Sequence, residues 1–169
     1  MNRTIASSII LFIILSSNYY VDACEPCVKQ LNFEETVKDS DLIILGQKVA
    51  DGPSTAAEGH CDPYTCGPDW IEVKIINVLN GPEIAGRLKV NSWDGMCNYG
   101  IVVDSQEYIM FLKRRSVEHE DYRYDAVNYG CSIHTYLVQN NTVDFEGKKI
   151  AIDEFKEKIK KIIDEEKTK

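Results

Sequence analysis

The sequence predicts a small, mainly β protein, built as a five-stranded barrel with a short helix before the first strand and an amphipathic helix at the end. Three observations predict this fold. Apolar runs of strand length recur at irregular spacing, turn-forming residues separate them, and an isoleucine stripe with helical spacing closes the chain. A β-sandwich would need about seven strands at more even spacing, so a strongly bent barrel is favoured.

The N-terminal segment is expected to lie outside this fold. Residues 1–23 hold the single cation Arg3, an apolar run over residues 9–15 and a short tail that ends at Ala23. This pattern is typical of a secretory signal peptide, and its apolar run is shorter than the about 20 residues that span a bilayer. We therefore expect cleavage after Ala23, which leaves one domain over residues 24–169 that begins at Cys24.

The first half of the domain contains a helix, a strand, a loop and a second strand. Residues 32–38 begin with a capping asparagine and carry acidic residues in the first turn, which predicts a short helix. The compact apolar run over residues 41–49 predicts a strand. Residues 51–69 hold three prolines and three glycines, so a long exposed loop is expected. Residues 70–79 predict a long half-buried strand, which the turn signal Asn80-Gly81-Pro82 ends.

The second half contains three more predicted strands and the closing helix. Residues 87–93 and 107–112 predict the third and fourth strands, a polar stretch over residues 113–125 interrupts, and residues 131–138 predict the fifth. Trp70 and Trp93 are expected to fill the barrel. The closing helix, about residues 152–166, is predicted from an apolar stripe that should pack on the barrel: Ile152, Phe155, Ile159, Ile162 and Ile163. Five strands is the number found in an oligonucleotide/oligosaccharide-binding (OB) barrel.

Six cysteines follow the signal segment, namely Cys24, Cys27, Cys61, Cys66, Cys97 and Cys131. An even number behind a secretion signal indicates a disulfide framework, although six cysteines allow 15 pairings. A zinc site that uses the two closely spaced pairs with His60 is the competing interpretation, and a redox pair at Cys24 and Cys27 is another. Thiolates survive poorly outside the cell and no βαβ context follows Cys27, so structural bridges are favoured.

Charge and residue pattern exclude several function classes. The net charge of −8 argues against nucleic acid as a partner, because an acidic surface repels phosphate. His60, His119 and His134 lie in different segments, and no catalytic triad has a recognisable context. We therefore expect a monomer that is not an enzyme and holds neither a cofactor nor a metal of its own. Asn140-Asn141-Thr142 is a glycosylation sequon.

The order of these features resembles the netrin-like module and, within it, the inhibitory domain of the tissue inhibitors of metalloproteinases. The resemblance covers roughly residues 24–138. The marks that carry it are Cys24 and Cys27 at the start, Phe33 before the strand at 41–49, the strand and turn at 71–81, the lone Cys97, the strand at 107–112, and the final Cys131.

The resemblance implies an OB-fold barrel with the disulfides Cys24–Cys97 and Cys27–Cys131, and it leaves Cys61–Cys66 as a local bridge. It also implies a secreted inhibitor of zinc metalloendopeptidases. In that family the α-amine and carbonyl oxygen of the first cysteine chelate the catalytic zinc of the protease, so this role falls to Cys24. Glu25 and Pro26 would contact the partner, with the loops around Tyr64 and Trp93 beside them.

This sequence departs from the family in two ways, and two other functions stay open. Glu25 and Pro26 separate the first two cysteines, where the family inhibitors have one residue, and the second, cysteine-rich domain of the animal inhibitors is missing. One alternative is a netrin-like module that binds an extracellular or matrix partner without inhibiting a protease. The other is a lipoprotein acylated at Cys24, because Val21-Asp22-Ala23-Cys24 resembles a lipid-attachment box.

Overall fold

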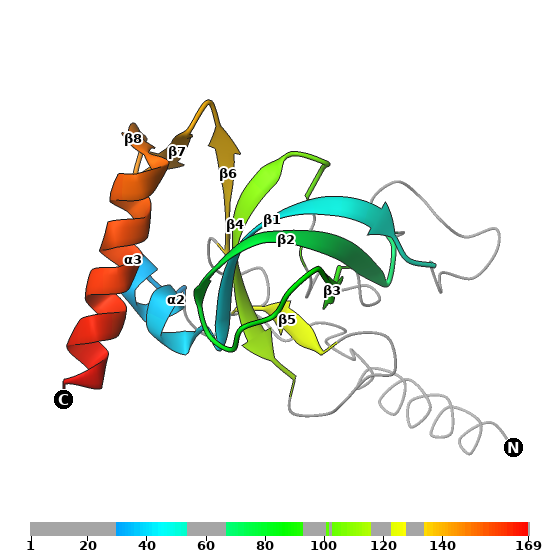
Figure 1. Ribbon diagram of the computed structural model, residues 1–169, viewed down its shortest axis with the longest axis horizontal. Coiled ribbons are helices and arrows are strands. Elements are labelled where there is room, and N and C mark those ends of the chain that lie inside the picture. Colours follow the sequence, from blue (N-terminus) through cyan, green and yellow to red (C-terminus); the bar gives the residue numbers. More distant parts are fainter. Residues whose placement is uncertain are drawn as a thin grey trace, which may run out of the picture.

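The computed structural model describes residues 30–53, 67–92, 101, 103–115, 123–127 and 134–168 (Figure 1). Two helices and eight strands lie within these ranges. In chain order they are α2 (Phe33–Asp39), β1 (Leu42–Asp51), β2 (Trp70–Asn80), β3 (Arg87–Asn91), β4 (Glu107–Arg114), β5 (Tyr124–Ala126), β6 (Thr135–Gln139), β7 (Thr142–Phe145), β8 (Lys148–Ala151) and α3 (Ile152–Lys167).

Five of the strands close into a barrel. β1 pairs with β2 on one side and with β4 on the other, β2 pairs with β3, and β5 joins β3 to β4. The β3–β5 pair is parallel, with Val90 opposite Tyr124, and the other pairs in the ring are antiparallel. This confirms the predicted mainly β chain with a closed five-stranded barrel, a short helix before it and a helix at the C-terminal end.

The identity of the fifth barrel strand was predicted wrongly. The ring closes through β5 and not through residues 131–138. β5 overlaps the end of the polar stretch, residues 113–125, that was expected to interrupt the sheet. β6 occupies part of residues 131–138 but pairs with β4 outside the ring, and residues 131–133 lie outside the described residues. β5 is only three residues long, and its central residue is the buried Asp125, so its sequence lacks the usual strand pattern.

β6, β7 and β8 form a meander that extends the sheet beyond the barrel (Figure 1). Two tight turns connect them, and both central residues of each turn have positive φ: Asn140 and Asn141 at 51° and 61°, and Glu146 and Gly147 at 52° and 74°. Two-residue turns of this kind match the twist of antiparallel strands. The sequence analysis did not predict β7 or β8, although the Asn-Asn pair is a recognisable turn signal.

The apolar side chains form two cores, one on each face of the barrel wall. Leu42 and Ile44 of β1 face the barrel interior, whereas Ile43 and Leu45 face the layer between the barrel and the two helices. β4 alternates in the same way, with Met110 inside. Because these strands are covered on both faces, their apolar runs are continuous, and each buried Leu or Ile contributes about 1.5–3 kcal/mol to folding.

The two helices pack on the outside of the barrel and against each other. α2 begins with the predicted cap: the Asn32 side chain accepts from the Glu35 amide at 2.9 Å, and the Glu35 carboxylate accepts from the Asn32 amide at 3.0 Å. In α3, Phe155 and Ile159 are buried in the outer core, which confirms that the apolar stripe packs on the barrel. In Figure 1 both helices lie at the same side of the barrel.

Candidate functional site

The residues predicted to carry the function lie outside the described residues. These are Cys24, Glu25 and Pro26, the remaining cysteines Cys27, Cys61, Cys66, Cys97 and Cys131, and the flanking Tyr64 and Trp93. The structure therefore describes the surface that the N-terminal segment joins, starting at Gln30. That surface is the N-terminal edge, which we define as the start of α2 with the parts of β4, β6 and β7 beside it.

An aromatic cluster fixes the start of α2. The ring centroid of Phe33 lies 4.8 Å from that of Phe145, 5.2 Å from Phe155 and 6.1 Å from both Phe111 and Tyr136. The pairs with Phe111, Tyr136 and Phe145 have edge-to-face geometry, in which the positive edge of one ring meets the negative face of another. The rings come from two helices and from β4, β6 and β7, so Phe33 holds α2 to all of these elements.

Polar contacts tie the other end of α2 to the end of β4. The Lys113 ammonium donates to the Asp39 carboxylate at 2.8 Å and to the Asp39 carbonyl oxygen at 2.9 Å. The Asp41 carboxylate accepts from the Arg114 amide at 2.8 Å. These groups are exposed, so each contact contributes at most about 1 kcal/mol. They set the orientation of α2, whereas the aromatic cluster supplies most of its binding energy.

The residues that flank the two connections containing Cys97 and Cys131 are held by backbone hydrogen bonds. The Ile101 amide donates to the Asn91 carbonyl at 2.9 Å, which brings the two sides of the first connection together. Phe111 accepts from the Val127 amide at 3.1 Å and donates to the His134 carbonyl at 2.9 Å. Both sides of the second connection therefore lie at Phe111, whose ring contacts Phe33 at the start of α2.

A buried polar group joins β3, β4 and β5 near the first connection. Asp125 is 2% exposed, accepts from the Asn91 side-chain amide at 2.8 Å and lies 3.4 Å from the Arg115 guanidinium. An isolated buried carboxylate would cost several kcal/mol, and the Asn91 hydrogen bond and the Arg115 charge offset that cost. The group explains how a charged residue occupies the centre of β5. It is structural, since its carboxylate is committed to these partners.

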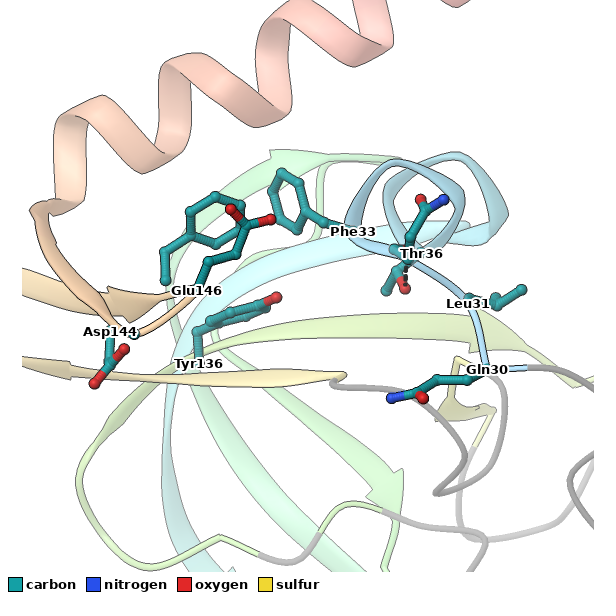
Figure 2. A pocket seen from close by; sticks show the side chains of 10 residues that line it. Gln30, Leu31, Phe33, Thr36, Tyr136, Asp144 and Glu146 are labelled. Carbon is teal, nitrogen blue, oxygen red and sulfur yellow. Dashed lines mark hydrogen bonds between the residues drawn. The ribbon is translucent and has the colours of Figure 1, made fainter.

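A pocket of about 480 Å³ opens at the N-terminal edge (Figure 2). The rings of Phe33, Tyr136 and Phe145 line it, and Gln30 and Glu146 lie at its rim. Tyr136 is 8% exposed. Burial raises the pKa of its hydroxyl to about 12, and the negative charge of Glu146 adds to the increase. This pocket was not predicted from the sequence, because its residues come from α2, β6 and the β7–β8 turn.

Other residues that the sequence analysis singled out do not form a site. Among the described residues, no group of three side chains has the composition of a metal site. His134 is in this part of the chain, while His60 and His119 are not. Asn140 of the sequon is exposed in the β6–β7 turn. Within the described ranges, no helix has the length and apolar character that crossing a membrane requires.

The prediction that Trp70 fills the barrel is wrong. Its neighbours Ile71 and Val73 belong to the inner core, so strand alternation places Trp70 on the outer face of β2. There its ring covers Gly52, where a Cβ atom would collide with it, and the Lys89 ammonium lies 3.9 Å from the ring centroid. Trp93 lies outside the described residues.

No protein-family model, no curated protein and no solved structure matches the chain.

Proposed function

We propose that this protein is a secreted inhibitor of zinc metalloendopeptidases, in which Cys24 becomes the first residue and chelates the zinc of the target through its α-amine and carbonyl oxygen. We further propose that the barrel is the OB barrel of a netrin-like module. The closed ring of five strands with one parallel pair supports this assignment. So does the position of α2, which connects the N-terminal segment to the outside of the barrel.

The observation that carries the proposal is the convergence of three chain segments at Phe111. The start of α2 contacts its ring, and both sides of the connection that contains Cys131 bond to its backbone. Cys27 precedes Phe33 by six positions, and an extended chain covers about 3.3–3.6 Å per residue. The lengths of these chain segments are compatible with the proposed Cys27–Cys131 disulfide, which needs a Cα separation of about 4.4–6.8 Å.

The chemistry requires a cysteine at the first position. A catalytic zinc has three protein ligands and a water and can expand to five-coordinate, so an α-amine and its own carbonyl oxygen can displace the water and bind together as a five-membered chelate. An α-amine has a pKa of about 7.7–8.0, so a useful fraction is neutral and able to bind metal at physiological pH. A disulfide at the same residue reduces the entropy that an unconstrained N-terminus would lose on binding.

Glu25 narrows the choice of target. The residue after the chelating cysteine enters the specificity pocket of the protease in the family that this chain resembles. A carboxylate in an apolar pocket without a partner costs several kcal/mol. We therefore expect a target whose pocket carries a lysine or arginine side chain, and we expect Glu25→Ala to shift inhibition toward proteases with apolar pockets.

The test is inhibition by the secreted, oxidised protein of a panel of zinc endopeptidases that cleave quenched fluorescent peptides. One alanine added before Cys24 moves the amine out of the chelate, and one alanine added after Lys169 is the matched control. We expect the first extension to weaken inhibition at least 100-fold and the second to leave it unchanged.

Two results would overturn the proposal. One is the absence of inhibition across the panel by a chain whose first residue is verified as Cys24. The other is inhibition that tolerates the N-terminal extension. A non-protease partner whose binding survives acetylation of the N-terminus would instead support the netrin-like interaction module.

A further inference from the structure

We infer that the pocket at the N-terminal edge binds a primary alkylammonium group, such as a lysine side chain, with Glu146 and Tyr136 as acceptors and Phe33 and Phe145 as walls. This site lies on described residues only, and its test does not depend on protease inhibition. The ligand class follows from the lining, since aromatic rings contact a methylene chain and a carboxylate with a hydroxyl accepts from its ammonium end.

The first argument is that Tyr136 presents its hydroxyl to the pocket from a side chain that is otherwise buried. The residue is 92% buried, and within the described part of the chain its hydroxyl has no hydrogen-bond partner. The oxygen is accessible from the pocket, so a ligand that enters can replace water as its hydrogen-bond partner. Figure 2 shows this hydroxyl directed into the space between Phe33 and Gln30.

The second argument is the charge at the rim. Glu146 lines the same pocket, and in Figure 2 its carboxylate lies beside the Phe33 ring; among the described residues it forms no ion pair. Asp144 also lines the pocket, although its carboxylate turns away from the Tyr136 hydroxyl. Lys149 lies opposite Asp144 across the β7–β8 pair, and the Lys158 ammonium lies 5.9 Å from the centroid of the Phe145 ring. Because Glu146 has no paired cation among the described residues, its carboxylate favours a cationic ligand over an anionic one.

The third argument is the position of Glu146 in the chain. It is the first central residue of the β7–β8 turn, with φ 52°, where asparagine, aspartate and glycine are the usual residues. Glutamate is less favourable than these residues at this turn position, but its side chain is longer and its carboxylate lines the pocket. The aromatic walls are fixed by packing, with Phe33 and Phe145 4.8 Å apart, so the pocket is formed before a ligand enters.

The test measures binding of Nα-acetyl-lysine N-methylamide to the secreted, oxidised chain by calorimetry and by NMR of the aromatic protons. Nα-acetyl-norleucine N-methylamide is the matched probe, because it lacks only the ammonium group. We expect the lysine probe to bind at least ten-fold more tightly and to shift the Phe33 and Tyr136 resonances. Equal or weaker binding of the lysine probe would overturn the inference.

Three variants locate the site. Glu146→Gln should weaken binding of the lysine probe at least five-fold, and Tyr136→Phe should weaken it at least three-fold, while both keep the shape of the side chain. Glu83→Gln, an exposed carboxylate in the β2–β3 connection, is the control for net charge and should change nothing. Equal affinity of the Glu146→Gln variant and the Glu83→Gln control, with circular dichroism of the parent, would also overturn the inference.

A further arm identifies the source of the ammonium. If n-butylamine binds as tightly as the lysine probe, a free amine is sufficient, whereas a requirement for the peptide groups indicates the side chain of a partner protein.

Discussion

Replacing Phe33 with alanine removes a ring that contacts four others and should detach α2 from the barrel. Phenylalanine-to-alanine changes in a core cost about 3–5 kcal/mol, and edge-to-face ring pairs contribute about 0.5–1.5 kcal/mol beyond the buried area. Phe33 is half-buried, which places the expected loss at the lower end, about 3 kcal/mol. For a chain of this size that corresponds to a decrease in Tm of about 6–12 °C.

The assay is guanidinium and thermal unfolding of the oxidised protein, followed by far-UV circular dichroism. Phe33→Leu keeps most of the volume and should cost about 1 kcal/mol. Val49→Thr, at a side chain that is 42% exposed, is the control and should stay within about 0.5 kcal/mol of the parent. A loss below about 1 kcal/mol for Phe33→Ala would refute the argument that the aromatic cluster anchors α2.

Three more predictions use the same unfolding measurements. Asn32→Ala removes the capping box and should lower the free energy of unfolding by about 1 kcal/mol, and an unchanged value would contradict the role of the cap. Asp125→Ala leaves Arg115 without its carboxylate and should cost about 3 kcal/mol, whereas Glu83→Ala should cost less than about 0.5 kcal/mol. The raised pKa of Tyr136 means that the folded state keeps a proton that the unfolded chain loses above pH 10. Stability attributable to this group is therefore complete below pH 10 and declines by about 2–3 kcal/mol as the pH rises through 12. The difference between the parent and Tyr136→Phe isolates this contribution, and parallel pH profiles for the two would count against it.

The elements predicted best are those whose pattern is local. The compact apolar run before Gly46 identified β1, and alternation identified β2, each within two residues of its bounds. The apolar stripe identified α3 to within one residue of the observed Ile152–Lys167. In each case the buried face is encoded by the spacing of neighbouring residues, so a single segment is sufficient to reveal it.

The elements that were missed depend on distant partners. β5 contains Asp125, whose burial is possible only because Asn91 and Arg115 reach it from β3 and from the end of β4. No reading of residues 124–126 alone would place a charged residue inside a barrel wall. Trp70 shows the same limit, because its side of β2 is set by the pairing with β3, not by its size or apolar character.

The residues of the candidate site also depend on parts of the chain that are distant in the sequence. The N-terminal chelate was proposed from the family resemblance, whose marks are spread in order over roughly residues 24–138. The ammonium pocket brings Phe33 together with Tyr136 and Glu146, which follow it by more than 100 positions, and they meet only when α2 packs on the β6–β8 meander. The positive φ at Glu146 is a property of the folded turn, and the residue type alone does not indicate it.

The most direct test of the central claim is the intact mass of the secreted protein without reduction, followed by disulfide mapping of its proteolytic peptides. The account predicts a chain that starts at Cys24 with a free amine and has lost six hydrogens to three bridges, with Cys24 joined to Cys97 and Cys27 to Cys131. A chain that starts at another residue, an acylated Cys24, or a free thiol at Cys24 would contradict it.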